Sequence, residues 1–280
     1  MNKRNLLLAL ALVFPASAYA DAAEKMTGFV SPESVLEAFD GPDGRIYVSE
    51  IGEFGKDGDG KVSVIVRGKK QDFATGMDDP KGLAMTGGNV YVADKKGVLK
   101  ITSDGNWTVF AAAGDFPAPL QFPNDLETDA KGNLYLSDTG DLKGNGGAIY
   151  RIDKHGKITT VLANNPQLQG PNGLLMDSND ALLEVDFVSG ILYRIQLGTG
   201  KMTKIAEGFG GGDGLARGKD GTLYVSDWKG GKVFSVSKKG KVTLLKDGYQ
   251  SAADISLSRN GKFILVPDMK AGEISWLPVK

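Results

Sequence analysis

The chain of 280 residues contains no cysteine and one histidine, and these two scarcities exclude several kinds of functional site. Without cysteine there is no disulfide, no thiolate zinc site and no cysteine nucleophile. A single histidine cannot build a multi-histidine metal site. That residue, His155, stands between Asp153 and Gly156 in a stretch that is typical of an exposed turn. We therefore expect no catalytic role for His155.

The chain also lacks a strong excess of charge and a long apolar run. Its 33 basic and 34 acidic residues nearly cancel and form no basic stripe, so nucleic acid is not an expected partner. The apolar run from Leu6 to Val13 is too short to span a bilayer, and no membrane span is expected. Lys3 and Arg4 precede it and Ala18-Tyr19-Ala20 follows, a pattern typical of a signal peptide. We predict cleavage of the first twenty residues near Ala20 and a periplasmic or secreted protein.

Glycine, by contrast, is abundant, with 39 residues, and short apolar runs alternate with turns, which favours an all-β protein. Six related segments recur every 41 to 48 residues, the period of a four-stranded β-propeller blade. The segments begin with Pro32-Glu33-Ser34-Val35, Pro80-Lys81-Gly82-Leu83, Pro123-Asn124-Asp125-Leu126, Pro171-Asn172-Gly173-Leu174, Gly212-Asp213-Gly214-Leu215 and Ala253-Asp254-Ile255-Ser256. We therefore predict that residues 21–280 form a single domain, a six-bladed β-propeller with four-stranded antiparallel blades.

Each repeat is expected to supply one blade, with its first strand innermost. In the third repeat, the pattern predicts outer strands at 148–152 and 158–162. The sixth repeat reaches Lys280 after three strands. We therefore expect residues 26–30 to supply its fourth strand, so that an N-terminal strand closes the ring and removes the exposed sheet edge.

An acidic residue ends the second strand of every repeat. Because a residue that recurs in all six repeats points to architecture, we interpret these acids as structural. A carboxylate at this place can accept backbone N–H bonds in the turn that follows. The six residues are Glu50, Asp94, Asp138, Asp186, Asp227 and Asp268.

Six other polar residues are expected to encircle one mouth of the central channel, because inner strands line that channel. Polar groups that converge at an axis cost desolvation energy unless they bind something. Carboxylate and amide oxygens suit Ca²⁺, and also Mg²⁺ or Mn²⁺, whereas zinc prefers nitrogen or sulfur. A water-filled polar funnel is the alternative interpretation. The six residues are Glu33, Lys81, Asn124, Asn172, Asp213 and Asp254.

The segments around Glu33, Asn124, Asn172 and Asp213, one to a blade and in this order, resemble those of the senescence marker protein/gluconolactonase/luciferin-regenerating enzyme family. The resemblance covers nearly the whole chain after its first twenty residues. It implies a divalent metal on the axis, held by Glu33, Asn172 and Asp213, with Asn124 contacting the substrate or, through water, the metal. It also implies that Asp213 is the general base of lactone hydrolysis.

The function that this resemblance implies is a divalent-metal-dependent hydrolase of the lactonase or esterase type, with Ca²⁺ as the first candidate metal. The metal would polarise the carbonyl of a small-molecule lactone or ester. Asp213 would orient or deprotonate the attacking water. Asn124 would be a second donor to the negative charge that develops on the carbonyl oxygen.

Two residues depart from the family's pattern. Sugar lactonases of the family often carry Arg two residues before the position of Asn124, where it binds substrate hydroxyls. This chain has Phe122 there, so a gluconolactone-type substrate is not expected. Lys81 adds an ammonium group to the ring, and we expect it to pair with Asp254 or Glu33 or to bind an anionic part of the substrate. Asn124, Lys81 and Asp254 are therefore candidate substrate contacts.

Two other functions fit the same scaffold. A non-catalytic propeller would bind a small ligand or a protein without turnover, and Lys81 together with the missing Arg favours it. A lyase or synthase is the third possibility, because propellers carry many chemistries. Ligand binding that survives loss of Asp213, without turnover, would distinguish the binding module from a hydrolase.

Overall fold

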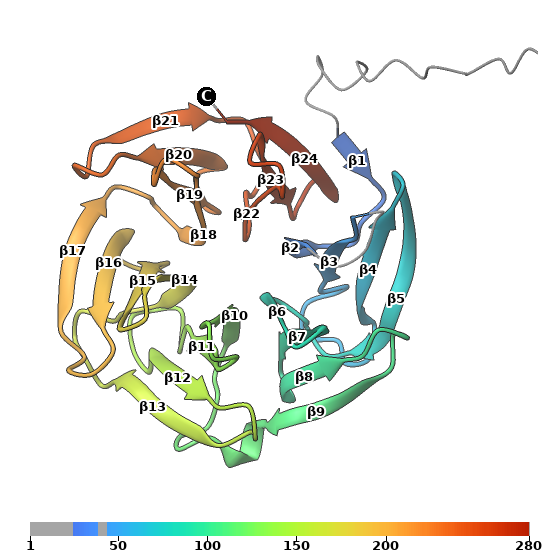
Figure 1. Cartoon of the computed structure of the whole chain (residues 1–280), viewed down its shortest axis with the longest axis horizontal. Coiled ribbons are helices and arrows are strands. Elements are labelled where there is room, and N and C mark those ends of the chain that lie inside the picture. The colour runs from blue at the N-terminus through green and yellow to red at the C-terminus, as the bar shows by residue number, and fades with distance from the viewer. Residues whose placement is uncertain (1–24, 39–43, 280) are drawn as a thin grey trace, which may run out of the picture.

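The computed structural model describes residues 25–38 and 44–279, which contain 24 strands in six four-stranded sheets. The sheets surround a central channel, and the strand that begins each repeat lies innermost in its sheet (Figure 1). Neighbouring strands pair antiparallel in every sheet, as in the third, where β10, β11, β12 and β13 follow one another outward. The predicted six-bladed β-propeller is confirmed. The predicted signal peptide lies outside the described residues.

Five sheets are each built from four consecutive strands. The first contains β2 (Pro32–Glu37), β3 (Ile46–Glu50), β4 (Gly60–Val66) and β5 (Lys69–Met77), and the second contains β6 (Leu83–Thr86), β7 (Asn89–Asp94), β8 (Gly97–Ile101) and β9 (Trp107–Ala112). The third contains β10 (Pro123–Thr128), β11 (Leu134–Asp138), β12 (Ala148–Ile152) and β13 (Ile158–Ala163). The fourth contains β14 (Pro171–Ser178), β15 (Ala181–Asp186), β16 (Ile191–Gln196) and β17 (Met202–Glu207), and the fifth contains β18 (Gly212–Arg217), β19 (Leu223–Asp227), β20 (Lys232–Val236) and β21 (Val242–Lys246). A 3₁₀ turn, Ala113–Asp115, follows β9.

The sixth sheet joins the two ends of the described chain. It contains β22 (Ser256–Leu257), β23 (Phe263–Asp268), β24 (Glu273–Pro278) and, as its outermost strand, β1 (Lys25–Thr27). Lys25 faces Ser275 and Thr27 faces Glu273 in an antiparallel ladder. Closure by an N-terminal strand is thereby confirmed, although this strand begins one residue earlier and ends sooner than predicted.

The hydrophobic core is divided into layers between neighbouring sheets. Tyr91 and Val98 of the second sheet, for example, pack with Leu136 and Tyr150 of the third. Because a middle strand has a sheet neighbour on both of its faces, all five residues of β11 are buried, whereas the outer strand β13 has none that is fully buried. Each buried Leu or Val side chain stabilises the fold by about 1.5–3 kcal/mol.

The recurring acids have the structural role that was predicted. Asp138 accepts N–H bonds from Gln121 and Phe122, which precede the inner strand, and from Gly140 in the turn that follows. Asp268 makes the equivalent bonds to Gln250 and Ser251. Each acid therefore fixes the start of an inner strand, and this is the place where the channel-facing polar residues begin.

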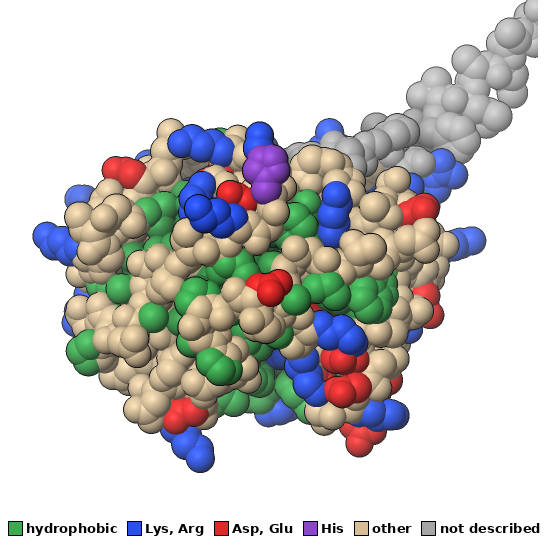
Figure 2. Space-filling model, turned by 90° about the horizontal axis from the view of Figure 1, so that it is seen from below, with side chains coloured by type: hydrophobic (Ala, Val, Ile, Leu, Met, Phe, Trp, Pro, Cys, Tyr) green, Lys and Arg blue, Asp and Glu red, His purple; other side chains and the backbone are tan. Residues whose placement is uncertain are grey.

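The single histidine, His155, is exposed in the turn between β12 and β13 (Figure 2), and its backbone N–H donates a hydrogen bond to the Asp153 carboxylate. This placement agrees with the turn that the sequence predicts. Basic and acidic side chains are interspersed on the face that Figure 2 shows. Within residues 25–38 and 44–279, no helix has the length and apolar character needed to cross a bilayer.

Candidate functional site

Five polar side chains from five sheets converge at one end of the channel, and we call them the polar ring. Each is at most 4% exposed, yet all five line a pocket of about 440 Å³. The members are Glu33 of β2, Lys81 just before β6, Asn124 of β10, Asn172 of β14 and Asp213 of β18.

A β-bulge turns four of these side chains toward the axis. The pairing between first and second strands shifts directly around Glu33, Asn124, Asn172 and Asp213. A bulge leaves one residue unpaired and re-aims its side chain. In three sheets a serine hydroxyl accepts the N–H that the bulge releases, at 2.7–2.9 Å. The pairs are Ser49 with Ser34, Ser137 with Asp125 and Ser226 with Gly214.

Glycines beside the polar ring allow neighbouring inner strands to approach one another. A Cβ atom on Gly173 would lie 2.0 Å from the carbonyl oxygen of Asp213, and one on Gly214 would lie 2.3 Å from the backbone nitrogen of Ile255. Both distances are far below a van der Waals contact. Without these glycines the strands would separate and the ring would widen.

Asp254, predicted as the sixth member, does not lie in this ring. Ala252 pairs with Asp268 as Pro123 pairs with Asp138, so Ala253 occupies the sixth position. Asp254 is one residue further along the channel, where it accepts a 2.5 Å hydrogen bond from the Ser34 hydroxyl and lines the cavity at the opposite end. The sixth repeat is displaced by one residue, a shift that similarity between segments does not show.

Lys81 is held by groups other than the predicted carboxylates. Its ammonium donates to the carbonyl oxygen of Asp79 at 3.1 Å and lies 4.5 Å from the centroid of the Phe122 ring. Within the described ranges, it forms no ion pair with Asp254 or Glu33. Burial lowers the pKa of Lys81, and the nearby charge of Glu33 opposes that effect. Phe122 thus packs against the one cation of the polar ring.

Within the part of the chain that the structure describes, the four other members of the ring each carry a buried oxygen with no hydrogen-bond partner. These atoms are Glu33 Oε2, Asn124 Oδ1, Asn172 Oδ1 and Asp213 Oδ1. A buried polar atom without a partner costs about 1–3 kcal/mol, and more when it is charged. Four such atoms, on four sheets and beside one pocket, indicate a ligand that accepts electron pairs from oxygen.

The orientation of Asn124 is fixed by Thr139, a residue that the sequence analysis did not single out. The Asn124 Nδ2 group donates to the Thr139 hydroxyl at 3.1 Å, and that hydroxyl donates to the carbonyl oxygen of Pro171 at 2.9 Å. Because Nδ2 is engaged, Oδ1 is the amide atom that remains for a ligand. Thr139 directly follows the recurring acid Asp138, so its position in the repeat could have identified it as a neighbour of the ring.

The two carboxyl groups of the polar ring are electrostatically strained without a counterion. Burial raises the pKa of Glu33 well above its ordinary value, and the charge of Asp213 raises it further. Burial likewise raises the pKa of Asp213, with added repulsion from Asp254 and Asp125. A divalent cation would neutralise both charges and favour their ionised forms.

The oxygen donors fit a hard divalent cation. Two carboxylates and two amides match the preference of Ca²⁺ or Mg²⁺ for oxygen ligands and supply the two negative charges that balance the ion. No three His, Cys, Asp and Glu side chains in residues 25–38 and 44–279 are arranged to hold a metal by themselves. Glu33, Asn172 and Asp213 would hold the ion, with Asn124 beside it.

Apolar side chains form the wall of the same pocket, and several occupy the position directly after a recurring acid. Ile51, Phe187, Trp228 and Met269 follow Glu50, Asp186, Asp227 and Asp268 in the chain, and all four line the pocket. The repeat itself contained the clue, because the residue after each acid starts a turn at the same end of the channel.

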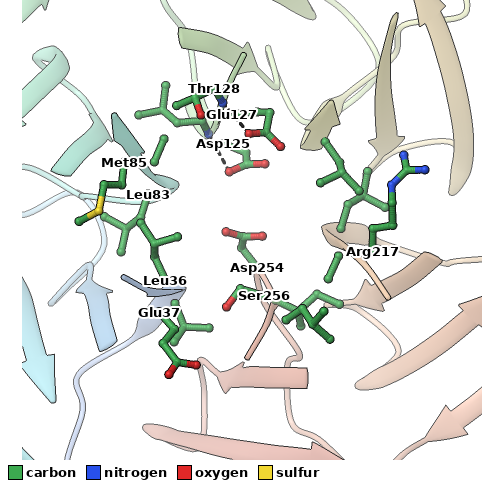
Figure 3. A pocket seen from close by; sticks show the side chains of 18 of the residues that line it. Leu36, Glu37, Leu83, Met85, Asp125, Glu127, Thr128, Arg217, Asp254 and Ser256 are labelled. Atoms are coloured by element: carbon green, nitrogen blue, oxygen red, sulfur yellow. Dashed lines mark hydrogen bonds between the residues drawn. The ribbon is translucent and has the colours of Figure 1, made fainter. Parts of the chain in front are cut away.

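The opposite end of the channel opens into a second cavity of about 520 Å³. Figure 3 shows the carboxylates of Asp125 and Asp254 facing each other there, among aliphatic side chains. Asp125 accepts the N–H groups of Leu126 and Leu174, at 2.7 and 2.6 Å. Burial raises the pKa of Asp254 and of Glu127 to about 7 each. Asp254 thus lines this cavity and not the pocket of the polar ring, although its charge still acts on Glu33 and Asp213.

Comparison with known families gives one match that spans most of the chain. The sequence model of the SMP-30/Gluconolactonase/LRE-like region matches residues 60–247. The matched range includes Lys81, Asn124, Asn172 and Asp213, whereas Glu33 precedes it.

Individual relatives are more distant. The protein STRICTOSIDINE SYNTHASE-LIKE 3 of Arabidopsis thaliana is 24% identical over 225 residues, which cover 67% of this chain and 56% of that protein. The chain thus spans little more than half of that relative's length. Regucalcin, a calcium-binding protein from Agrobacterium tumefaciens, has a similar structure, with a TM-score of 0.72, 19% identity and 90% of each chain covered. Virginiamycin B lyase from Staphylococcus aureus gives a TM-score of 0.65 and 17% identity over 92% of this chain and 99% of the lyase. These structural similarities establish the fold.

Proposed function

The chain belongs to the SMP-30/gluconolactonase/LRE-like family, and from this membership and the polar ring we propose that it is a divalent-metal-dependent hydrolase of lactones or esters. The observation that carries the proposal is the set of four buried, unpartnered oxygens on Glu33, Asn124, Asn172 and Asp213. Calcium is the preferred cation, because the set consists of hard oxygen donors of mixed charge. The calcium-binding regucalcin, which shares the fold, is consistent with that preference.

The residues of the ring divide the chemistry between them. A divalent cation, when bound, supplies Lewis acidity that polarises a substrate carbonyl. Asp213 takes a proton from the attacking water while the water oxygen bonds to the carbonyl carbon. The ester C–O bond then breaks, and Asp213 returns the proton to the leaving oxygen. Asn124, whose Nδ2 donates to Thr139, would offer its unpartnered Oδ1 to the cation, in place of the donor role to the carbonyl oxygen that the sequence suggested.

Hydrolysis of a lactone and ester panel tests the proposal. Purified protein should hydrolyse at least one member, lose that activity in EDTA and regain it when Ca²⁺ is restored. Asp213→Asn should reduce kcat by about 100-fold or more, since general-base catalysis contributes about 10²–10⁴-fold. Glu127→Gln is the matched control, because it removes a half-buried carboxyl at the opposite cavity. Activity that is indifferent both to EDTA and to Asp213→Asn would overturn the proposal.

A binding module without catalysis is the second candidate, and the buried ammonium of Lys81 favours it. An anion bound at Lys81 would need no general base. In that case a ligand should bind equally well to wild type and to Asp213→Asn, no member of the panel should turn over, and Lys81→Met should abolish binding.

A lyase or synthase reaction in the same pocket is a further possibility, and it would yield a different product from hydrolysis. The names of the synthase-like relative and of the lyase with the same fold make this a concrete alternative. Mass spectrometry of the product distinguishes the cases, because hydrolysis adds the mass of one water to the substrate. A product of unchanged mass, or a condensation product, would replace the hydrolase assignment.

A further inference from the structure

The pocket above the polar ring is polar only at its base. Apart from the ring and Lys229, its lining is hydrophobic, with Phe54, Phe122, Phe187 and Trp228 among the residues that surround it. Its volume of about 440 Å³ falls in the range of small-molecule sites. The part of a substrate that extends away from the reacting carbonyl would therefore meet carbon surfaces.

Neighbouring rings and lysine side chains pack against the aromatic part of this wall. The rings of Phe187 and Trp228 are 6.1 Å apart at a tilt of 57°. The Lys229 ammonium lies 4.1 Å from the Phe187 centroid and donates to the carbonyl oxygen of Phe187, and Lys270 lies 4.3 Å from the Trp228 centroid. Cation–π contacts of this kind hold aromatic rings in place. Lys229 thus uses one of its three ammonium N–H donors on the Phe187 carbonyl.

Two exposed hydrophobic residues extend the wall to the pocket mouth. Phe54 is 52% exposed and Leu142 is 42% exposed, and both line the pocket. The loop that carries Phe54 is anchored, because the N–H of Gly55 is donated to the carboxylate of Asp79 at 3.1 Å. Because Phe54 and Leu142 line the same pocket as the aromatic wall, they extend one apolar surface and are not isolated exposed residues.

Leu142 also adopts a backbone conformation that a leucine disfavours. Its φ is +60°, in the left-handed region, where non-glycine residues are uncommon. The turn is held by Asp141, whose carboxylate accepts the N–H groups of Lys143 and Asn145 at 2.8 and 2.9 Å. A glycine at position 142 would relieve the strain, whereas leucine places an apolar side chain at the mouth.

From this arrangement we infer that the pocket selects lactones or esters with an aryl or alkyl substituent and rejects polyhydroxylated sugar lactones, with Phe54 and Leu142 as specificity-determining residues. The inference rests on the proposed hydrolase function for the identity of the reacting group. A sugar hydroxyl buried against these carbon surfaces would lose its hydrogen bonds to water and gain none. An alkyl chain gains free energy for each buried methylene instead.

A series of lactones measures this selectivity directly. For γ-lactones from γ-butyrolactone to γ-decalactone, kcat/KM should rise about two- to fourfold per added methylene until the pocket is filled. Glucono-1,5-lactone should be the poorest substrate. Phe54→Ala and Leu142→Ala should each raise the KM for γ-decalactone about five- to tenfold, and the rise in KM should be smaller for γ-butyrolactone, which has no alkyl chain to contact them.

The matched controls are Val109→Ala and Leu244→Ala, which shorten apolar residues of similar exposure, 46% and 47%, outside the pocket. Neither control should alter the KM for γ-decalactone. If glucono-1,5-lactone were as good a substrate as γ-decalactone, or if the Phe54 and Leu142 variants behaved like these controls, the inference would be overturned and the hydrolase function would stand.

Binding without turnover separates this inference from the proposed function. γ-Decalactone is titrated by calorimetry into EDTA-treated Asp213→Asn protein, and the titration is repeated with Phe54→Ala added. Binding that weakens about five- to tenfold with Phe54→Ala supports the apolar preference, whatever the catalytic result. If metal-loaded wild type hydrolysed no lactone or ester while this binding persisted, the hydrolase proposal would fail and the preference of the pocket would remain. No detectable binding of γ-decalactone would overturn the inference.

Discussion

Replacing Asp213 by Asn removes one ionisable group from the polar ring and leaves the shape of the ring unchanged. The two side chains have nearly the same size, but the amide cannot ionise. Without metal, the wild-type carboxyl is buried and repelled by the nearby Asp254 and Asp125, so its ionised form is destabilised. We therefore expect metal-free Asp213→Asn protein to be at least as stable as metal-free wild type at pH 8.

Calcium should reverse that order. A ligand at 100 times its Kd stabilises the folded state by about 2.7 kcal/mol. For a domain of this size each kcal/mol corresponds to a Tm shift of about 2–4 °C, so wild type should gain roughly 5–10 °C. Asp213→Asn removes one of two charged ligands and should retain little of that gain. The wild-type gain should shrink as the pH falls toward 5, because burial raises the pKa values of Glu33 and Asp213 and protons then compete with the metal.

The assay is thermal unfolding by circular dichroism, with EDTA and with a calcium series. Glu127→Gln is the control variant, and it should keep the full calcium shift because Glu127 belongs to the opposite cavity. The role of Asp213 as a calcium ligand would be refuted by a Tm shift in Asp213→Asn as large as in wild type, or by a wild type that calcium does not stabilise.

Three other substitutions test separate parts of the structure. Thr139→Val removes the hydroxyl that orients Asn124 and should weaken calcium binding about 10-fold, with recovery in Thr139→Ser, as measured by calcium titration. Burial raises the pKa of Glu127 from 4.5 to about 7, so this carboxyl alone should lower the wild-type free energy of unfolding by roughly 3 kcal/mol as pH rises from 4.5 to above 7. Glu127→Gln should remove that component from urea-unfolding curves, and an unchanged pH profile would contradict the assignment. Gly173→Ala would place a Cβ 2.0 Å from a backbone oxygen and should destabilise the protein by about 1–3 kcal/mol, whereas Gly198→Ala, with nothing within 4 Å, should be nearly neutral.

The fold was predictable because the repeat gives the same signal six times. Each inner strand is short, starts with Pro or Gly in most repeats, and leads to an apolar strand ended by an acid. The outer strand predicted at 148–152 has these bounds in the structure, as β12. Closure by residues near 26 followed from the missing fourth strand of the last repeat.

Five of the six residues that the sequence predicted for the polar ring lie in it. Glu33, Lys81, Asn124, Asn172 and Asp213 lie together as expected, because equivalent residues of a propeller lie at equal heights along the axis. Asp254 was misplaced, since sequence similarity aligns residue types whereas strand pairing decides which residue faces the axis.

Other parts of the site left weaker traces in the sequence. Thr139 could have been found from its position after a recurring acid. Leu142 could not, because it lies in a loop whose length differs from blade to blade, so no repeat marks it. The unpartnered oxygens depend on where every neighbouring hydrogen bond is made, and only coordinates show that.

The central claim is that oxygen atoms of the polar ring hold a divalent cation. Anomalous scattering from crystals soaked in Mn²⁺ tests it most directly, since Mn²⁺ accepts the same oxygen ligands as Ca²⁺ and Mg²⁺. We predict one strong peak within coordination distance of Glu33, Asn172 and Asp213, which disappears in crystals of Asp213→Asn. A map with no peak there, or with its strongest peak between Asp125 and Asp254 at the opposite cavity, would contradict the account.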